Sequence, residues 1–249
     1  MTEYKFPTEE VNLPSKGVLY PKSNPLSSGK VELKYMTAKE EDILTSINLI
    51  RKGIVLDKVL ESLVVNKKIK VDDMLIGDKN ALIIAIRILG YGKNYEVTAV
   101  CEDCSEESAL EVDCTKFKDV EVAKGVKENK FSMELPNTKA VLEFKLLNSA
   151  EESLVDKDVS ALQRVQPDYD YTNTFRFKRM ILSVNGDTRE AVINDFVDNQ
   201  FLSIDSLAFR TNLIKVTPDI ELSVPIELDD GEVEEVAVPV TVQFFWPSS

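Results

Sequence analysis

Apolar and polar positions along the chain follow two spacings, one typical of strands and one typical of helices. Residues 31–35 and 140–145 alternate between apolar and polar side chains, and a repeat of two residues predicts half-buried strands. Residues 81–89 are instead apolar except for Arg87. A helix over this stretch has no side suited to water, so the pattern predicts a buried helix.

The buried helix and the segment after it form the most distinctive unit of the sequence. Asp78 is the predicted N-cap, because its carboxylate can accept hydrogen bonds from the free N–H groups of the first turn. Gly90 and Gly92 predict the end of the helix, since glycine readily adopts the left-handed conformation that closes a helix. Residues 95–101 and 109–112 then predict the two strands of a β-hairpin.

Capping residues and apolar spacing predict the other elements. Thr37 with Glu40, and Asn148 with Glu151, have the spacing of a capping box, in which side chains satisfy the backbone donors at a helix start. The helix that Thr37 begins places Ile43, Ile47 and Ile50 on one face. Another predicted helix starts at Asp57 and turns Val59, Leu60, Leu63 and Val64 inward. Further helices are predicted over residues 175–184, 191–197 and, after a cap at Asp205, 207–216. The last predicted strands, residues 221–228 and 233–244, flank a hairpin turn at residues 229–231.

The order of these elements occurs twice. Residues 33–44 and 144–155 both read as a strand, a cap and a helix that starts with two glutamates. The apolar helix that begins near Asp78 corresponds to the one that begins near Asp205, and a predicted hairpin follows each helix. We infer an internal duplication; the alternative is a chance similarity between common strand–helix patterns.

The duplication predicts an α+β fold of two related halves, each made of a strand, helices and a β-hairpin. The two copies cover roughly residues 33–113 and 144–244. The predicted division is an extended, proline-containing segment over residues 1–30, a first unit over residues 31–128 and a second unit over residues 129–249. Prolines and weak periodicity indicate that the N-terminal segment lies extended on another surface.

Composition narrows the classes of function. The 249 residues carry a formal net charge of −13 and no histidine, which disfavours contact with nucleic-acid phosphates and removes Ser-His and Cys-His catalytic pairs. The densest basic run, residues 67–70, is typical of a solvated surface. The longest apolar block is about half as long as a membrane span. The N-terminus lacks the pattern of a signal peptide, so we expect no membrane span and a cytosolic location.

Cys101, Cys104 and Cys114 are the candidate metal ligands. The Cys-x-x-Cys turn offers two thiolates at a spacing that zinc accepts, and the fourth ligand would be a carboxylate, such as Asp103 or Asp113, or come from another chain. The alternative is a tight turn with reduced thiols. A redox role is disfavoured, because neighbouring acidic residues raise the pKa of a thiol. Bound zinc would make the alternative function a zinc-ribbon-like nucleic-acid-binding adaptor, which the net charge opposes.

The chain ends with large aromatic side chains, Phe244, Phe245 and Trp246. Such residues dominate the energy of many protein interfaces, so this end could anchor a partner. The alternative is that they close the last strand over the core. No nucleophile, base and oxyanion site come together in the sequence, so no active site is predicted.

Several short motifs span nearly the whole chain in order. They are Leu13–Pro21, Met36–Glu41 at a helix start, Ile76–Lys79 before the apolar helix, Ile86–Gly92, the Cys101–Cys104 turn and Phe244–Pro247. Together these motifs resemble the baseplate hub assembly protein family of T-even-like contractile-tailed phages. That family often carries a second cysteine knuckle before the final strand, which this sequence lacks.

The resemblance implies a non-enzymatic phage protein, either a structural component or an assembly factor of the central baseplate hub, with no catalytic residues. Its partners would be other phage baseplate and hub proteins, with oligomerisation inside the baseplate left open. It would act in the host cytoplasm during assembly and remain in the tail baseplate if retained. The candidate partner-binding residues are Leu13, Pro14, Tyr20, Phe244, Phe245 and Trp246.

Overall fold

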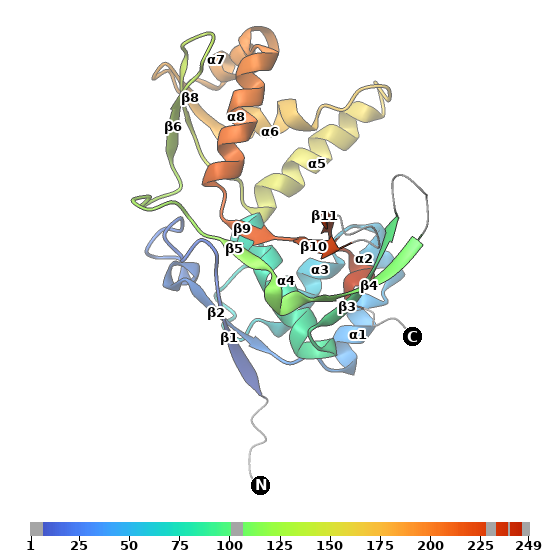
Figure 1. Ribbon diagram of the computed structural model, residues 1–249. Helices are drawn as coiled ribbons and strands as arrows, with labels where there is room; N and C mark the ends of the chain where they lie inside the picture. The colour runs from blue at the N-terminus through green and yellow to red at the C-terminus, as the bar shows by residue number, and fades with distance from the viewer. Residues whose placement is uncertain (1–6, 101–106, 228–232, 239, 246–249) are drawn as a thin grey trace.

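Helices and short antiparallel strands alternate along the chain, as Figure 1 shows. The computed structural model describes residues 7–100, 107–227, 233–238 and 240–245. The α-helices are α1 Ala38–Leu44, α2 Ile47–Arg51, α3 Val55–Leu63, α4 Ile76–Tyr91, α5 Ser149–Gln163, α6 Thr172–Met180, α7 Glu190–Asp195 and α8 Ser203–Val216. The shorter helical turns are η1 Pro25–Ser28, η2 Val71–Asp73, η3 Cys114–Lys116, η4 Phe196–Gln200 and η5 Val242–Phe245.

The strands form small sheets in which every pairing is antiparallel within the described residues. They are β1 Thr8–Asn12, β2 Lys30–Lys34, β3 Asn94–Val100, β4 Glu107–Asp113, β5 Lys118–Val120, β6 Phe131–Glu134, β7 Val141–Phe144, β8 Ile181–Val184, β9 Asp219–Glu221, β10 Ser223–Glu227 and β11 Val233–Ala237. The largest sheet has the order β6-β7-β8, and the pairs are β1-β2, β3-β4, β5-β9 and β10-β11. Helices combined with separate antiparallel sheets confirm the predicted α+β class.

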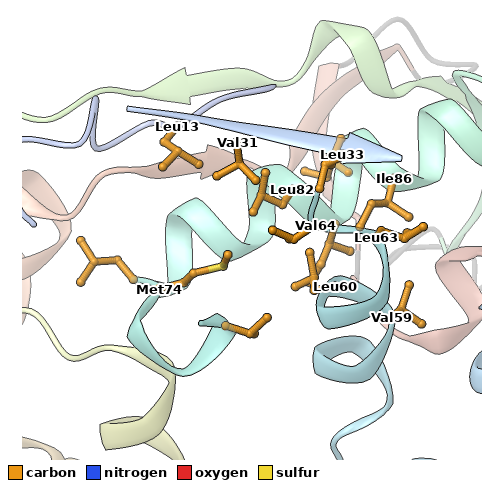
Figure 2. Close-up of a cluster of buried hydrophobic side chains, with 14 of the residues drawn as sticks. Leu13, Val31, Leu33, Val59, Leu60, Leu63, Val64, Met74, Leu82 and Ile86 are labelled. Atoms are coloured by element: carbon orange, nitrogen blue, oxygen red, sulfur yellow. The ribbon is translucent and has the colours of Figure 1, made fainter. Parts of the chain in front are cut away.

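A first hydrophobic core surrounds α4. Figure 2 shows Leu82 and Ile86 of α4 close to Leu60 and Leu63 of α3 and to Leu33 of β2. All five side chains are fully or almost fully buried. The apolar surface of α4 is thus covered by α3 and β2, as expected for a helix without a solvent face.

A second core lies in the upper part of Figure 1, between the β6-β7-β8 sheet and helices α6 to α8. Phe209 of α8 packs edge-on against Phe144 of β7, with ring centroids 4.9 Å apart, and against Phe177 of α6 at 5.4 Å. Edge-to-face packing of buried rings adds to their hydrophobic contribution. Helix α5 contributes to the first core instead, through Val155 and Val159.

The chain crosses back to the first core after α8. Strand β9 pairs with β5, and both lie between the two cores in Figure 1. Val238, Phe244 and Phe245 are then buried in the first core. The predicted division near residue 128 stays a prediction. The first core contains residues from both sides of that position.

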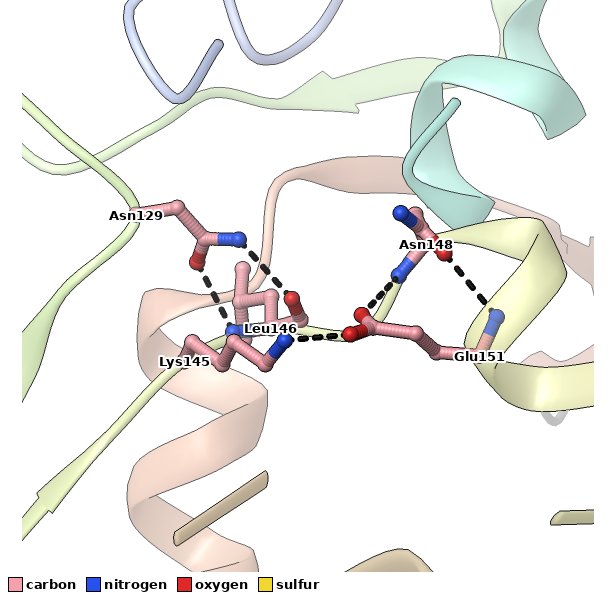
Figure 3. Close-up of polar contacts among 5 residues, drawn as sticks. All are labelled: Asn129, Lys145, Leu146, Asn148 and Glu151. Atoms are coloured by element: carbon pink, nitrogen blue, oxygen red, sulfur yellow. Dashed lines mark hydrogen bonds and ion pairs between the residues drawn. The ribbon is translucent and has the colours of Figure 1, made fainter. Parts of the chain in front are cut away.

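Both predicted capping boxes are present. Figure 3 shows the second one, where the Asn148 side chain accepts from the Glu151 N–H at 2.9 Å and Glu151 accepts from the Asn148 N–H at 3.2 Å. Glu151 also pairs with Lys145. The Asn129 side chain forms hydrogen bonds of 2.8 Å with the N–H and the carbonyl of Leu146, so the segment just before β6 is fixed to the chain just before α5.

Several predicted boundaries are wrong. Asp78 and Asp205 lie at the third position of α4 and α8, and the N-caps are Leu75 and Leu202. Asp57 lies inside the first turn of α3 rather than at its cap. Each aspartate is still near the positive end of a helix dipole, which explains the sequence signal.

Two other helix predictions also need correction. Residues 181–184 form strand β8 instead of continuing α6, because they pair with β7. The predicted face of Ile43, Ile47 and Ile50 is divided between α1 and α2, and Ile47 and Ile50 are exposed. The predicted end of α4 is confirmed at Gly92, whereas Gly90 is still helical.

Among the glycines that the structure describes, Gly77 lies closest to the backbone of another segment. A Cβ atom at this position would overlap the Pro218 carbonyl oxygen and lie 2.6 Å from the Asp219 Cα. We expect Gly77→Ala to lower the free energy of unfolding by about 3 kcal/mol, because backbone rather than a side chain must move. Urea denaturation measures the change.

Gly90→Ala is the matched control in the same helix. Its Cβ would meet mainly the terminal methyl group of Met36, which can rotate away. Alanine is also the better helix former, so we expect no loss and a gain of up to about 1 kcal/mol. Equal effects of the two substitutions would contradict a tight crossing at Gly77.

Candidate partner-binding site

The N-terminal segment is held by a buried carboxylate of α4. Asp78 accepts hydrogen bonds from the Ser15 N–H at 2.9 Å, the Ser15 hydroxyl at 2.6 Å and the Tyr20 hydroxyl at 2.6 Å. The Tyr20 oxygen in turn accepts from the Leu75 N–H at 2.9 Å. Burial raises the pKa of Tyr20, as does the nearby Asp78 charge, so the phenol stays neutral and donates.

This network turns the predicted N-terminal contact residues inward. Leu13, Pro14 and Tyr20 are all buried within the chain. The segment does lie on another surface, as its prolines predict, but that surface is α4 of the same chain. These three side chains are therefore used inside the fold.

Asp205 of α8 occupies the equivalent place in the second half. Its carboxylate accepts from the backbone N–H groups of Asn137 at 2.8 Å and Thr138 at 3.0 Å. Leu135 and Pro136 precede this turn, as Leu13 and Pro14 precede Ser15. The matching turns and buried aspartates support the duplication, which stays a prediction.

The two aspartates should respond to acid in opposite directions. Burial holds the pKa of Asp78 above its ordinary value of 3.8, despite its hydrogen bonds. For Asp205 burial also raises the pKa, but the bonds from Asn137 and Thr138 outweigh it and leave the pKa below 3.8. Ionisation of Asp78 thus makes the folded state less stable than it is with Asp78 protonated, whereas ionisation of Asp205 makes it more stable.

Asn variants should reveal this difference in urea unfolding between about pH 3 and pH 7. As pH falls through the raised pKa towards 3.8, the Asp78 penalty disappears from the wild type. The stability lost in Asp78→Asn therefore grows with acid. The stability lost in Asp205→Asn shrinks below 3.8, because the wild type loses the contribution of its carboxylate. Parallel pH profiles of the two variants would contradict this assignment.

The described part of the C-terminus is also directed inward. Phe244 and Phe245 are buried, while Trp246 lies outside the described residues. Arg87 of α4 fixes this end, because its Nε donates to the Phe244 carbonyl at 2.7 Å. The burial supports the interpretation that these aromatics close over the core.

Of the three candidate zinc ligands, Cys114 lies within the described residues. It is buried at the base of the β3-β4 hairpin, where its N–H donates to the Lys93 carbonyl at 2.8 Å.

Cys101 and Cys104 themselves lie outside the described residues, and zinc at this pair stays a prediction. Burial raises the pKa of the Cys114 thiol, which disfavours a metal-binding thiolate there. Within the described ranges, no three His, Cys, Asp or Glu side chains gather as a metal site would require. No helix in those ranges has the length and apolar character needed to cross a membrane.

An apolar groove opens where the two cores meet. Its volume is about 570 Å³, and we call it the junction groove. Its apolar lining includes Leu75, Leu147, Met180, Leu213, Ile214 and Pro218. Arg176 and Glu152 form an ion pair at 2.8 Å on its wall, and Asp156 and Asp219 add negative charge. Such a groove suits an apolar segment of a partner.

Sequence reasoning missed the exposed aliphatic side chains of α8 and its N-cap, of which Ile214 lines this groove. Helix α8 was predicted to bury its apolar residues, yet Leu202, Ile204, Leu207 and Ile214 are exposed. The spacing of 204, 207, 211 and 214 carries the signal, because steps of three and four residues mark one narrow face of a helix.

Comparison with known proteins identifies the class of protein. A family model described as T4 bacteriophage base plate protein matches residues 8–246 of this sequence. The chain is thus a protein of the bacteriophage tail baseplate. It belongs to the T4 bacteriophage base plate protein family, which confirms the resemblance found in the motifs. Comparisons with curated proteins and with solved structures each gave no match.

Proposed function

We propose that this baseplate protein acts at the central hub, as a structural component or assembly factor, and works through protein–protein contacts rather than catalysis. The junction groove is the observation that carries the proposal. It places an apolar opening between two cores, where a neighbouring protein can contact both.

The buried charged groups support a structural role. Asp78 and Arg87 bind backbone groups of the N-terminal and C-terminal segments, and Asp205 binds the turn after Pro136. These groups are occupied in holding the fold together and do not converge on the junction groove. Assembly in the host cytoplasm, before incorporation into the baseplate, is part of the same proposal.

Copurification from infected cells tests the hub assignment. The full chain, tagged and supplied in place of the untagged copy, is isolated during tail assembly and its partners are identified by mass spectrometry. We expect hub proteins of the same phage to be enriched over wedge proteins. Enrichment of wedge proteins alone would overturn the hub assignment.

Deletion of the gene completes this test. We expect particles without functional baseplates when the chain is absent. Normal tails after deletion, together with no copurified baseplate protein, would overturn the proposed function. A salt-dependent shift of DNA by the purified chain would instead favour a nucleic-acid adaptor.

A further inference from the structure

Helix α8 carries an apolar ridge that is exposed to solvent. Ile204 is 60% exposed, Leu207 56% and Ile214 75%. With Thr211, which is also exposed, these residues follow steps of three, four and three. That is the a/d spacing of a coiled-coil seam. We call these four residues the α8 ridge.

The opposite face of α8 agrees with this heptad register. If Ile204 is an a position, Phe209 is an f position, directly away from the seam. Phe209 is fully buried in the second core. Asp205, at position b, is fully buried as well. The helix therefore has one face packed on its own chain and one complete seam left in solvent.

On α4, other parts of the chain cover the face that corresponds to the α8 ridge. The alignment of Asp78 with Asp205 places Leu82 beside Phe209, and both side chains are fully buried. On α4 the positions equivalent to the ridge include Gly77 and Arg87. Pro218 crosses over Gly77, and the Phe244 backbone lies on Arg87. The same face is thus covered by chain on α4 and open on α8.

The edges of the ridge are positively charged. Arg210 and Lys215 occupy the g and e positions beside the seam, and both are exposed. Neither has an ion-pair partner in the described part of the chain, although the whole chain carries a net charge of −13. Charges at e and g select partners in helix pairs, so the ridge favours acidic edges on the helix that covers it.

The α8 helix of a second copy of the chain does not supply these acidic edges. The e and g positions of α8 are Ser203, Ala208, Arg210 and Lys215. None is acidic, so two α8 helices would set cationic or neutral edges against each other. Like charges at these positions disfavour pairing.

We propose that the α8 ridge binds one amphipathic helix of another baseplate protein, with Asp or Glu residues flanking its apolar seam. The ridge extends from Ile204 to Ile214, about 15 Å or three turns. Ile214 also lines the junction groove, so the ridge ends at the edge of that groove. The proposal rests on the proposed function and names the surface and the chemistry of its partner.

Site-specific photocrosslinking in infected cells tests the ridge. Benzoylphenylalanine replaces Leu207 in the full chain, and crosslinked peptides are identified by mass spectrometry. The matched control places the same group at Ile47 of α2, which is 64% exposed. We expect position 207 to capture an acidic helical segment of another baseplate protein, and position 47 not to capture that segment. Capture of a second copy, or no capture at position 207, would overturn the proposal.

Charge and polarity variants give a second measurement. Leu207→Asp should reduce copurification of the captured protein at least about tenfold, and Ile47→Asp should leave it within about twofold. The double variant R210E/K215E should reduce it as well, with partial recovery at high salt. Unchanged melting temperatures verify that the variants fold. Full copurification by Leu207→Asp would overturn the ridge alone, whereas a wild type without any baseplate partner would overturn the proposed function.

Discussion

Arg87→Met is expected to lower the free energy of unfolding by about 4 kcal/mol. The Arg87 side chain is buried in the first core and donates to three backbone carbonyl groups. Nε donates to Phe244 at 2.7 Å, Nη1 to Gly92 at 2.7 Å and Nη2 to Asn94 at 2.9 Å. Methionine fills much of the volume but leaves these buried acceptors without donors, and each such loss costs about 1–3 kcal/mol.

Two further variants separate hydrogen bonding from charge. Arg87→Lys keeps the charge but cannot reach three carbonyls with one ammonium group, so most of the loss should remain. Arg210→Met, on the exposed side of α8, should change the free energy of unfolding by less than about 0.5 kcal/mol. Guanidinium denaturation gives all three values. A loss below about 1 kcal/mol in Arg87→Met would show that the three bonds contribute little.

The sequence predicts the local parts of this fold well, because their causes lie a few residues apart. The capping boxes at Thr37 and Asn148 form as expected, since each joins residues three positions apart. The β3-β4 hairpin also forms, because apolar alternation on both strands agrees with its register. Such signals require no knowledge of the rest of the chain.

Contacts between distant residues decide what the sequence pattern leaves open. Asp78 has the signature of a helix cap, but its acceptor oxygens are used by Ser15, 63 residues away. Residues 181–184 follow α6 directly and are mostly apolar, and pairing with β7 makes them a strand. A short apolar run fits either element until its neighbour is known.

The partner-binding surface was difficult to predict for the same reason. Phe244 and Phe245 suit an interface as well as a core, and the hydrogen bond from Arg87, 157 residues away, fixes them inside. The aliphatic residues of α8 look equally suited to burial. Their spacing defines a face, but only the completed fold shows that this face has no cover within the described chain.

Asp78→Ala is expected to release the N-terminal segment and to lower the free energy of unfolding by about 3 kcal/mol. The substitution removes both acceptor oxygens from the Ser15 N–H, the Ser15 hydroxyl and the Tyr20 hydroxyl, all of which are buried. The hydroxyls can turn towards other acceptors, but the backbone N–H cannot. Amide hydrogen exchange over residues 13–20 should therefore accelerate more than exchange in the second core.

Asp73→Ala is the matched control beside the same segment. Within the described residues its carboxylate accepts one side-chain hydrogen bond, from Asn24 at 3.3 Å, so little stability should be lost. Tyr20→Phe removes one bond to Asp78 and the acceptor of the Leu75 N–H. Because Asp78 and Tyr20 share one network, their double variant should lose less than the sum of the two single losses. Additive losses, or uniform exchange across both cores, would show that Asp78 stabilises the chain without specifically holding its N-terminal segment.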